Sequence, residues 1–210
     1  MTSSQGDHLE TEQKYDADAG FALPTLGSLP ELGGRRATEP RRIYLSATYF
    51  DTEDQRLIQH KVTLRRRVGG DDEGWHLKLP AGQDTRQELH APLAEGDAGR
   101  VPARLTARVK DITAGEHLRP VAILDTERTV VRLAGTSGDA LVEVADDLVT
   151  AVRLGGTDTE PMRWREIEVE VLTPGDEATA LLEKLGEMLS GAGARPSASG
   201  SKLARVLGTG

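Results

Sequence analysis

Charged residues recur at every second position in several short segments of this chain. Residues 10–14 read ETEQK, residues 64–67 read LRRR and residues 166–170 read EIEVE. Because side chains alternate across a β-strand, residues two apart point to the same side. Each segment therefore predicts a strand that gathers charge on one face.

These faces carry the side-chain types that bind phosphate and divalent metal ions. A guanidinium group can pair with phosphate oxygens through two parallel hydrogen bonds. Carboxylates without His or Cys partners favour hard cations such as Mg²⁺ or Mn²⁺, which bind through oxygen. A polyphosphate with its divalent metal ion would satisfy both kinds of side chain. The cations expected on these faces are Lys14, Arg65, Arg67, Lys78, Arg86, Arg128 and Arg132, and the acids are Glu10, Glu12, Glu88, Glu143, Asp147, Glu166, Glu168 and Glu170.

Period-two alternation predicts the strands that must position these residues. The expected strands cover residues 8–16, 42–50, 62–68, 74–79, 86–91, 121–133, 140–149 and 163–172. The expected helices cover residues 54–59, 101–112 and 176–190. A solvated outer face would explain any one charged strand face, but adjacent like charges repel unless ligands or counter-charges oppose them. We therefore predict an α+β fold, mainly antiparallel β, in which an eight-stranded closed β-barrel turns its charges inward and helices pack outside.

Several short motifs follow one another along the chain. They begin with Glu10-x-Glu12-x-Lys14 and continue with residues 49–52 (YFDT), 64–67 (LRRR), 75–79 (WHLKL), 165–170 (REIEVE) and 201–202 (SK). In this order they resemble the signature of the CYTH superfamily, also called triphosphate tunnel metalloenzymes. The resemblance covers residues 8–207.

This resemblance implies an antiparallel tunnel that binds a triphosphate and hydrolyses or cyclises it with a divalent metal ion, Mg²⁺ or Mn²⁺. The implied metal ligands are Glu10, Glu12, Glu168 and Glu170, with Asp147. The implied phosphate-binding cations are Lys14, Arg65, Arg67, Lys78, Arg128 and Lys202, and Arg86 joins them from its strand face. Among all of these, Glu10, Glu12, Lys14 and Lys202 are expected to take part in catalysis.

The inner faces favour a substrate without an aromatic ring. Aromatic residues make up 3% of the chain, and few of them fall on those faces. We therefore expect hydrolysis of tripolyphosphate to pyrophosphate and phosphate. Two alternatives stay open: a nucleotide-using relative, either a nucleoside triphosphatase or an adenylate cyclase, and a non-catalytic polyphosphate-binding module. The acidic residues argue against the binding module, because anion binding alone would not need them.

Composition excludes several classes of protein. No apolar run approaches the ~20 residues of a membrane span, and the N-terminus lacks the basic flank and apolar core of a secretory signal. The absence of cysteine excludes disulfides and thiolate zinc sites. A formal net charge of −8 argues against general binding to nucleic acid. We therefore expect a cytoplasmic monomer or homodimer that contacts neither membrane nor nucleic acid.

Domain organisation follows from the same pattern. Residues 1–7 are expected to form a disordered tail, and residues 8–208 a single domain. Proteins of the bacterial type that the motifs resemble are often fused to a helical, histidine-rich CHAD domain. We expect this chain, which ends at Gly210, to lack that domain.

Some charged positions keep a simpler interpretation. We expect His76 and His90 to be exposed or at the rim of the barrel. For Arg132 and Glu166, near strand ends, surface ion pairs and ligand contacts are equally compatible with the pattern.

Overall fold

The computed structural model describes residues 8–28, 32–33, 35–82, 85–156 and 160–209, so the tail expected over residues 1–7 lies outside the described residues. The strands are β1 (His8–Ala17), β2 (Arg41–Asp51), β3 (Thr63–Val68), β4 (Gly74–Pro80), β5 (Thr85–Ala91), β6 (Arg119–Ala134), β7 (Ala140–Arg153), β8 (Met162–Val171) and β9 (Arg195–Pro196). The helices are α1 (Arg56–Gln59), α2 (Ala103–Arg108), α3 (Lys110–Thr113), α4 (Asp176–Gly191) and α5 (Lys202–Leu207), with 3-10 turns η1 (Leu26–Ser28) and η3 (Leu93–Glu95).

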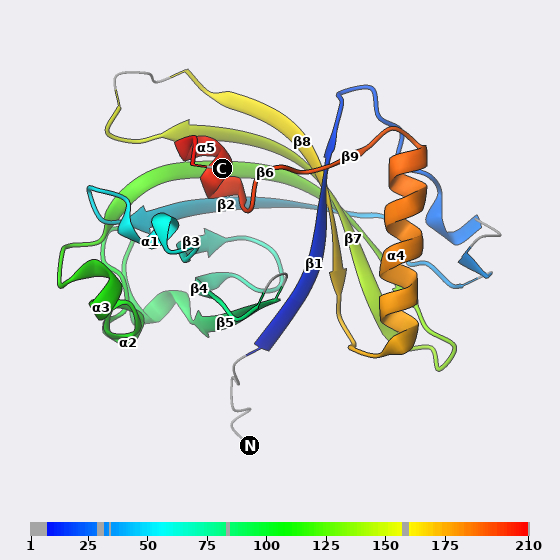
Figure 1. Cartoon of the computed structure of the whole chain (residues 1–210), viewed down its shortest axis with the longest axis horizontal. Coiled ribbons are helices and arrows are strands. Elements are labelled where there is room, and N and C mark those ends of the chain that lie inside the picture. Colours follow the sequence, from blue (N-terminus) through cyan, green and yellow to red (C-terminus); the bar gives the residue numbers. More distant parts are fainter. Residues whose placement is uncertain (1–7, 29–31, 34, 83–84, 157–159, 210) are drawn as a thin grey trace.

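The described strands form one curled antiparallel sheet (Figure 1). Their order is β5-β4-β3-β2-β6-β7-β8-β1-β9. The first part of β1 also pairs with β5, from His8 opposite Glu88, and its later part pairs with β8, from Glu12 opposite Glu170. The mainly antiparallel prediction is confirmed, and the sheet has nine strands where eight were expected.

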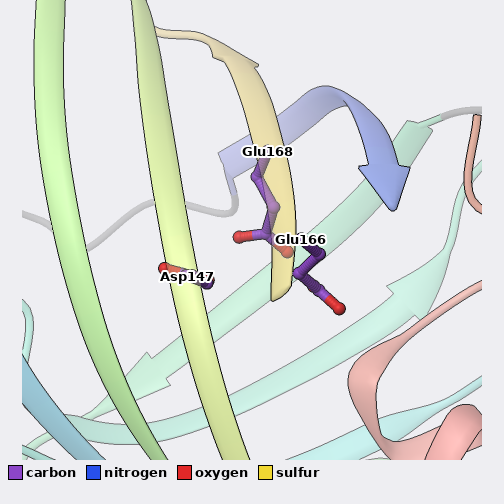
Figure 2. Close-up of side chains that lie close together, drawn as sticks. All are labelled: Asp147, Glu166 and Glu168. Atoms are coloured by element: carbon purple, nitrogen blue, oxygen red, sulfur yellow. The ribbon is translucent and has the colours of Figure 1, made fainter. Parts of the chain in front are cut away.

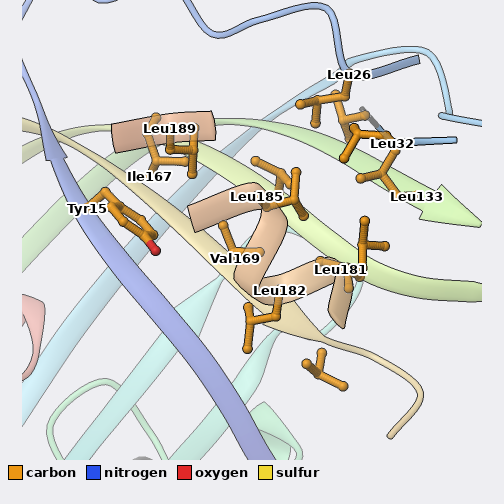
Figure 3. Packing of buried hydrophobic residues seen from close by; sticks show 14 of the residues in the cluster. Tyr15, Leu26, Leu32, Leu133, Ile167, Val169, Leu181, Leu182, Leu185 and Leu189 are labelled. Atoms are coloured by element: carbon orange, nitrogen blue, oxygen red, sulfur yellow. The ribbon is translucent and has the colours of Figure 1, made fainter. Parts of the chain in front are cut away.

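The alternation in β8 explains how one sheet face becomes apolar. Ile167 and Val169 are fully buried on the face that packs beneath α4, where Leu181, Leu185 and Leu189 meet them (Figure 3). The intervening glutamates must then point to the other face. The predicted helix over residues 176–190 is confirmed as α4.

One predicted helix differs from the structure, and one helix of the structure was not predicted. The helix expected over residues 101–112 is broken into α2 and α3 at Val109, whose backbone is not helical (φ −110°, ψ 8°) and whose side chain is buried in the same cluster as Leu105 and Trp75. The helix α5 was not expected, and it does not pack outside the sheet. Its Leu203 packs with Tyr49, which lines the concave side of the sheet, so α5 lies inside the curl (Figure 1).

A buried carboxylate fixes the turn that follows β2. Asp51 is fully buried and accepts hydrogen bonds from the backbone N–H groups of Thr52 (2.7 Å), Leu57 (2.8 Å) and Ile58 (3.0 Å). This assigns the aspartate of the YFDT segment a structural role at the start of α1.

Among the described helices, none is long and apolar enough to cross a membrane.

Candidate active site

A charged cavity of about 240 Å³ lies within the curl of the sheet. Strands β1 to β8 and helix α5 all contribute side chains to its lining. The cations that line it are Lys14, Arg41, Arg65, Arg67, Lys78, Arg86, Arg128, Arg132 and Lys202. The acids that line it are Glu12, Asp71, Asp72, Glu88, Glu143, Glu168 and Glu170.

The structure thus brings together most of the residues that the sequence singled out. Three of them lie differently, and Glu166 is one of these, because it is buried opposite Asp147 and is not among the lining residues. Asp147 is fully buried behind the lining, in contact with Arg128 and Lys202. Glu10 is placed by strand register, opposite Arg86 in the β1–β5 pair.

Three carboxylates form the acidic end of the site. Asp147 on β7 lies opposite Glu166 on β8, and Glu168 follows two residues later on the same face. One oxygen from each lies within 4.8 Å of the others (Figure 2). Glu166 is only 3% exposed, so of its two interpretations the surface ion pair is wrong.

Lys202, the first residue of α5, lies among these three carboxylates. Its Nζ is 2.9 Å from Asp147 Oδ2, 2.6 Å from Glu166 Oε1 and 2.8 Å from Glu168 Oε1. The contact with Glu166 does not have hydrogen-bond geometry. Although burial opposes ionisation, Lys202 and Arg128 keep the pKa of Asp147 below its usual value, and Lys202, Lys14 and Arg128 do the same for the pKa of Glu168.

Strand β1 adds an ion pair beside this cluster. Lys14 Nζ lies 3.0 Å from Glu12 Oε1 and 3.4 Å from Glu168 Oε1. Burial acts against the charged form of both Glu12 and Lys14, and their attraction prevails: the pKa of Glu12 is lowered and that of Lys14 is raised. Both groups are therefore charged at neutral pH.

The opposite wall is mainly basic, with Glu88 and Asp72 among its cations. Burial, together with the nearby Arg65 and Arg128, lowers the pKa of Arg67 to about 9. The shift thus comes from burial and from repulsion by these two neighbouring guanidinium groups, while Asp72 contacts Arg67 from the hairpin. An anionic ligand between these guanidinium groups would relieve the repulsion.

Tyr49 is a lining residue to which the sequence analysis gave no role. It is 4% exposed, and its hydroxyl accepts a 3.4 Å hydrogen bond from Arg65 Nη1. The signal was available in the YFDT segment, since Tyr49 follows Ile43 and Leu45 on the strand face that lines the cavity.

The expectation that His76 is exposed or at the rim is wrong. The ring is 3% exposed, with Nδ1 2.8 Å from Glu88 Oε1 and Nε2 2.9 Å from the carbonyl oxygen of Asp72. Asp72 belongs to the hairpin between β3 and β4, so this hairpin packs against the His76 ring. Burial lowers the pKa of His76 to about 3, against the hydrogen bond with Glu88 and with help from Arg65 and Arg67. His90 is partly exposed and stacks edge-on against His76 at 4.8 Å between ring centroids.

The acidic cluster fits a divalent cation by its donor set. Asp147, Glu166 and Glu168 offer only oxygen atoms, which hard cations such as Mg²⁺ and Mn²⁺ prefer. The ammonium of Lys202 lies within 3 Å of one oxygen from each of the three, so these oxygens already surround a positive charge.

Comparison with known proteins adds a family match. The model of the CYTH domain family matches residues 8–201. Two Mycobacterium tuberculosis proteins, Uncharacterized protein MT2285 (strain CDC 1551 / Oshkosh) and Uncharacterized protein Rv2226 (strain ATCC 25618 / H37Rv), are each 44% identical over 211 residues. Each match covers 96% of this chain, which spans 40% of the length of each relative.

Solved structures share the fold at low sequence identity. A candidate adenylate cyclase from Bacillus halodurans superposes with a TM-score of 0.62 at 17% identity, covering 95% of this chain and 98% of its own. The PH1819 protein from Pyrococcus horikoshii OT3 gives a TM-score of 0.51 at 17% identity, covering 96% and 99%. These two likenesses establish the fold alone.

Proposed function

The chain belongs to the CYTH domain family, and on that premise we propose that its cavity binds tripolyphosphate and hydrolyses it to pyrophosphate and phosphate with a divalent metal ion. The observation that carries this proposal is the arrangement of charge in one cavity. A basic wall from β3, β4 and β5 faces carboxylates from β1, β7 and β8. Family members bind triphosphates and depend on a metal ion.

The tunnel that the family fold implies depends on β1. This strand pairs with β8 on one side and with β5 on the other. We take β1 as the strand that completes the tunnel around the cavity. Its Glu12 and Lys14 then lie between the acidic cluster and the wall of β5.

The cations of the cavity are proposed to hold the substrate. Arg65, Arg67, Lys78 and Arg86 come from three neighbouring strands and line the same space. Their charges would offset those of the bound phosphates and of the leaving pyrophosphate, as in other phosphoryl-transfer sites. Hydrolysis breaks one P–O bond and adds the elements of water, so these residues need only position and stabilise charge.

We propose Asp147, Glu166 and Glu168 as the first metal ligands. A bound Mg²⁺ or Mn²⁺ would supply positive charge that polarises a phosphoryl oxygen and activates water. Glu12 and Glu170 lie opposite one another across the β1–β8 pair, and both line the cavity. Glu12 and Glu170 extend the acidic side, and Glu10, two residues before Glu12 on β1, stays a proposed ligand with them.

The lining disfavours a nucleotide substrate. Among the described residues that line the cavity, Tyr49 is the one aromatic side chain, and its hydroxyl accepts a hydrogen bond from Arg65. A nucleobase would therefore find little stacking surface. A pure polyphosphate-binding module is also disfavoured, because the buried carboxylates would oppose anion binding unless a metal ion joined them.

The experiment is a phosphate-release assay on the purified chain with tripolyphosphate and either Mg²⁺, Mn²⁺ or EDTA. ATP and thiamine triphosphate serve as parallel substrates. Metal-dependent release from tripolyphosphate supports the proposal. Preference for ATP would favour the nucleotide alternative, and tight tripolyphosphate binding without turnover would favour the binding module.

A further inference from the structure

The ammonium group of Lys202 occupies the place that a metal ion bound to the acidic cluster would need. It lies within 3 Å of one oxygen from each of Asp147, Glu166 and Glu168, at 2.9, 2.6 and 2.8 Å. The side chain of Lys202 is 9% exposed, and that of Asp147 is fully buried. Oxygen ligands bind Mg²⁺ at about 2.0–2.1 Å. An ion among these oxygens would therefore collide with the ammonium.

We propose that Lys202 and a divalent metal ion compete for the carboxylates of Asp147, Glu166 and Glu168, so that metal binding releases the ammonium into the cavity. The proposal rests on the proposed function in one respect: it takes this cluster as the metal site. It adds a coupling, because the released cation joins the wall that receives the phosphates.

Charge balance supports exchange over joint occupancy. Together with Glu12, the three carboxylates face three cations, Lys202, Arg128 and Lys14, which leaves one negative charge in excess. A divalent ion added beside all three cations would leave a buried excess of positive charge, which is costly. Replacement of the ammonium by the divalent ion brings the same group to neutrality.

The position of Lys202 allows it to leave. It is the first residue of the short helix α5 and follows the loop of residues 197–201, and its four-carbon stem is flexible. Lys202 and Lys14 both line the cavity. A released ammonium group would therefore stay within reach of phosphate oxygens in the cavity.

The test compares Mn²⁺ binding by the wild-type chain, Lys202→Met and the control Lys184→Met. Lys184 is an exposed residue of α4. Metal-free protein is titrated with Mn²⁺ in the absence of substrate, and free Mn²⁺ is read from its electron paramagnetic resonance signal. Fewer than about one wild-type molecule in ten is expected to have Lys202 away from the carboxylates before Mn²⁺ binds. Lys202→Met should therefore bind Mn²⁺ at least about tenfold more tightly than the wild type. Lys184→Met should match the wild type.

A second measurement needs no variant and therefore no assumption that Lys202→Met folds. Wild-type chain is acetylated briefly with and without Mn²⁺, and the modification of Lys202 and Lys184 is compared by mass spectrometry. Mn²⁺ should increase the acetylation of Lys202 and leave that of Lys184 unchanged. Unchanged acetylation of Lys202 at saturating Mn²⁺ would overturn the competition.

The outcomes separate this inference from the proposed function. Saturable Mn²⁺ binding of equal strength in the wild type and Lys202→Met would overturn the competition alone, and tripolyphosphate hydrolysis would still stand on its own assay. No Mn²⁺ binding to either protein would overturn the competition together with the metal dependence of the proposed function.

Discussion

Arg128 holds Asp147 with two hydrogen bonds of 2.7 Å each, from Nε and Nη2 to the two carboxylate oxygens. The two residues face one another across the β6–β7 pair. Arg128 Nη2 also donates a 2.5 Å hydrogen bond to Glu168. One guanidinium group therefore fixes the orientation of two of the carboxylates that Lys202 contacts. The acidic cluster is built from nonlocal strand pairing, and several consequences can be measured.

Replacement of Arg128 by lysine should destabilise the protein despite the conserved charge. A lysine cannot form the two parallel hydrogen bonds to Asp147 and leaves part of a buried carboxylate unsatisfied. We expect Arg128→Lys to lower the free energy of unfolding by about 1.5–3 kcal/mol, measured by urea denaturation. The control Arg163→Lys lies on an exposed position of β8 and should change little. Equal stability of both variants would contradict this role of Arg128.

The helix that carries Lys202 depends on a cap. Ser201 Oγ accepts a 3.1 Å hydrogen bond from the backbone N–H of Ala204. Ser201→Ala should therefore lower the free energy of unfolding by about 1 kcal/mol, the usual value of such a cap. Ser201→Asn restores a good capping side chain and should recover most of the loss in the same denaturation assay. Identical values for the two variants would exclude capping as the cause.

The buried guanidinium group of Arg67 should contribute to tripolyphosphate binding in the absence of metal. We expect Arg67→Met to weaken tripolyphosphate binding in EDTA by about tenfold or more, since a hydrogen bond to a charged group is worth about 1.5–3 kcal/mol. Isothermal titration calorimetry gives the dissociation constant. Arg66→Met is the matched control, because the neighbouring side chain points to the opposite strand face and does not line the cavity. A loss of affinity in Arg66→Met as large as in Arg67→Met would contradict the assignment.

Stability should decrease as the pH falls, because burial lowers the pKa of His76 in the folded protein. In the unfolded chain His76 takes up a proton as the pH falls through about 6.5, but in the folded protein its pKa is lowered to about 3. The unfolded state therefore binds more protons between these values, and the free energy of unfolding decreases as the pH falls across that window.

Urea denaturation at pH 7.5, 6 and 5 measures this loss. The part due to His76 approaches about 1.4 kcal/mol per pH unit below 6.5. His76→Gln should flatten the dependence, whereas His117→Gln, at an exposed position, should keep it. An unchanged slope in His76→Gln would show that other groups cause the loss.

The sequence could predict those parts of the site that depend on alternation within one strand. Arg65 and Arg67, or Glu168 and Glu170, share a face because β3 and β8 keep period two across these positions. In β6 the register shift of the β6–β7 pair lies between Leu133 and Ala134, beyond the inward-facing charges, so their predicted face is preserved.

The remaining features depend on contacts that local patterns do not encode. The meeting of Asp147 with Glu166 depends on the register between β7 and β8. The helix α5 has six residues, too few for a periodic signal, and it is held by packing inside the curl. The burial of His76, whose Nε2 lies 2.9 Å from the carbonyl oxygen of Asp72 in the hairpin after β3, cannot be read from the alternation within its own strand.

We propose that the carboxylates of the cluster make this cavity a metal-dependent triphosphatase. The decisive experiment measures phosphate release from tripolyphosphate with Mn²⁺ by the wild type, Glu168→Gln and Glu187→Gln, the last being an exposed position of α4. We expect the wild type and Glu187→Gln to turn over equally and only with metal. Glu168→Gln should be slower by at least about 100-fold, the loss typical of removing one group that stabilises transition-state charge. Equal rates for Glu168→Gln and the wild type, or release that persists in EDTA, would contradict the account.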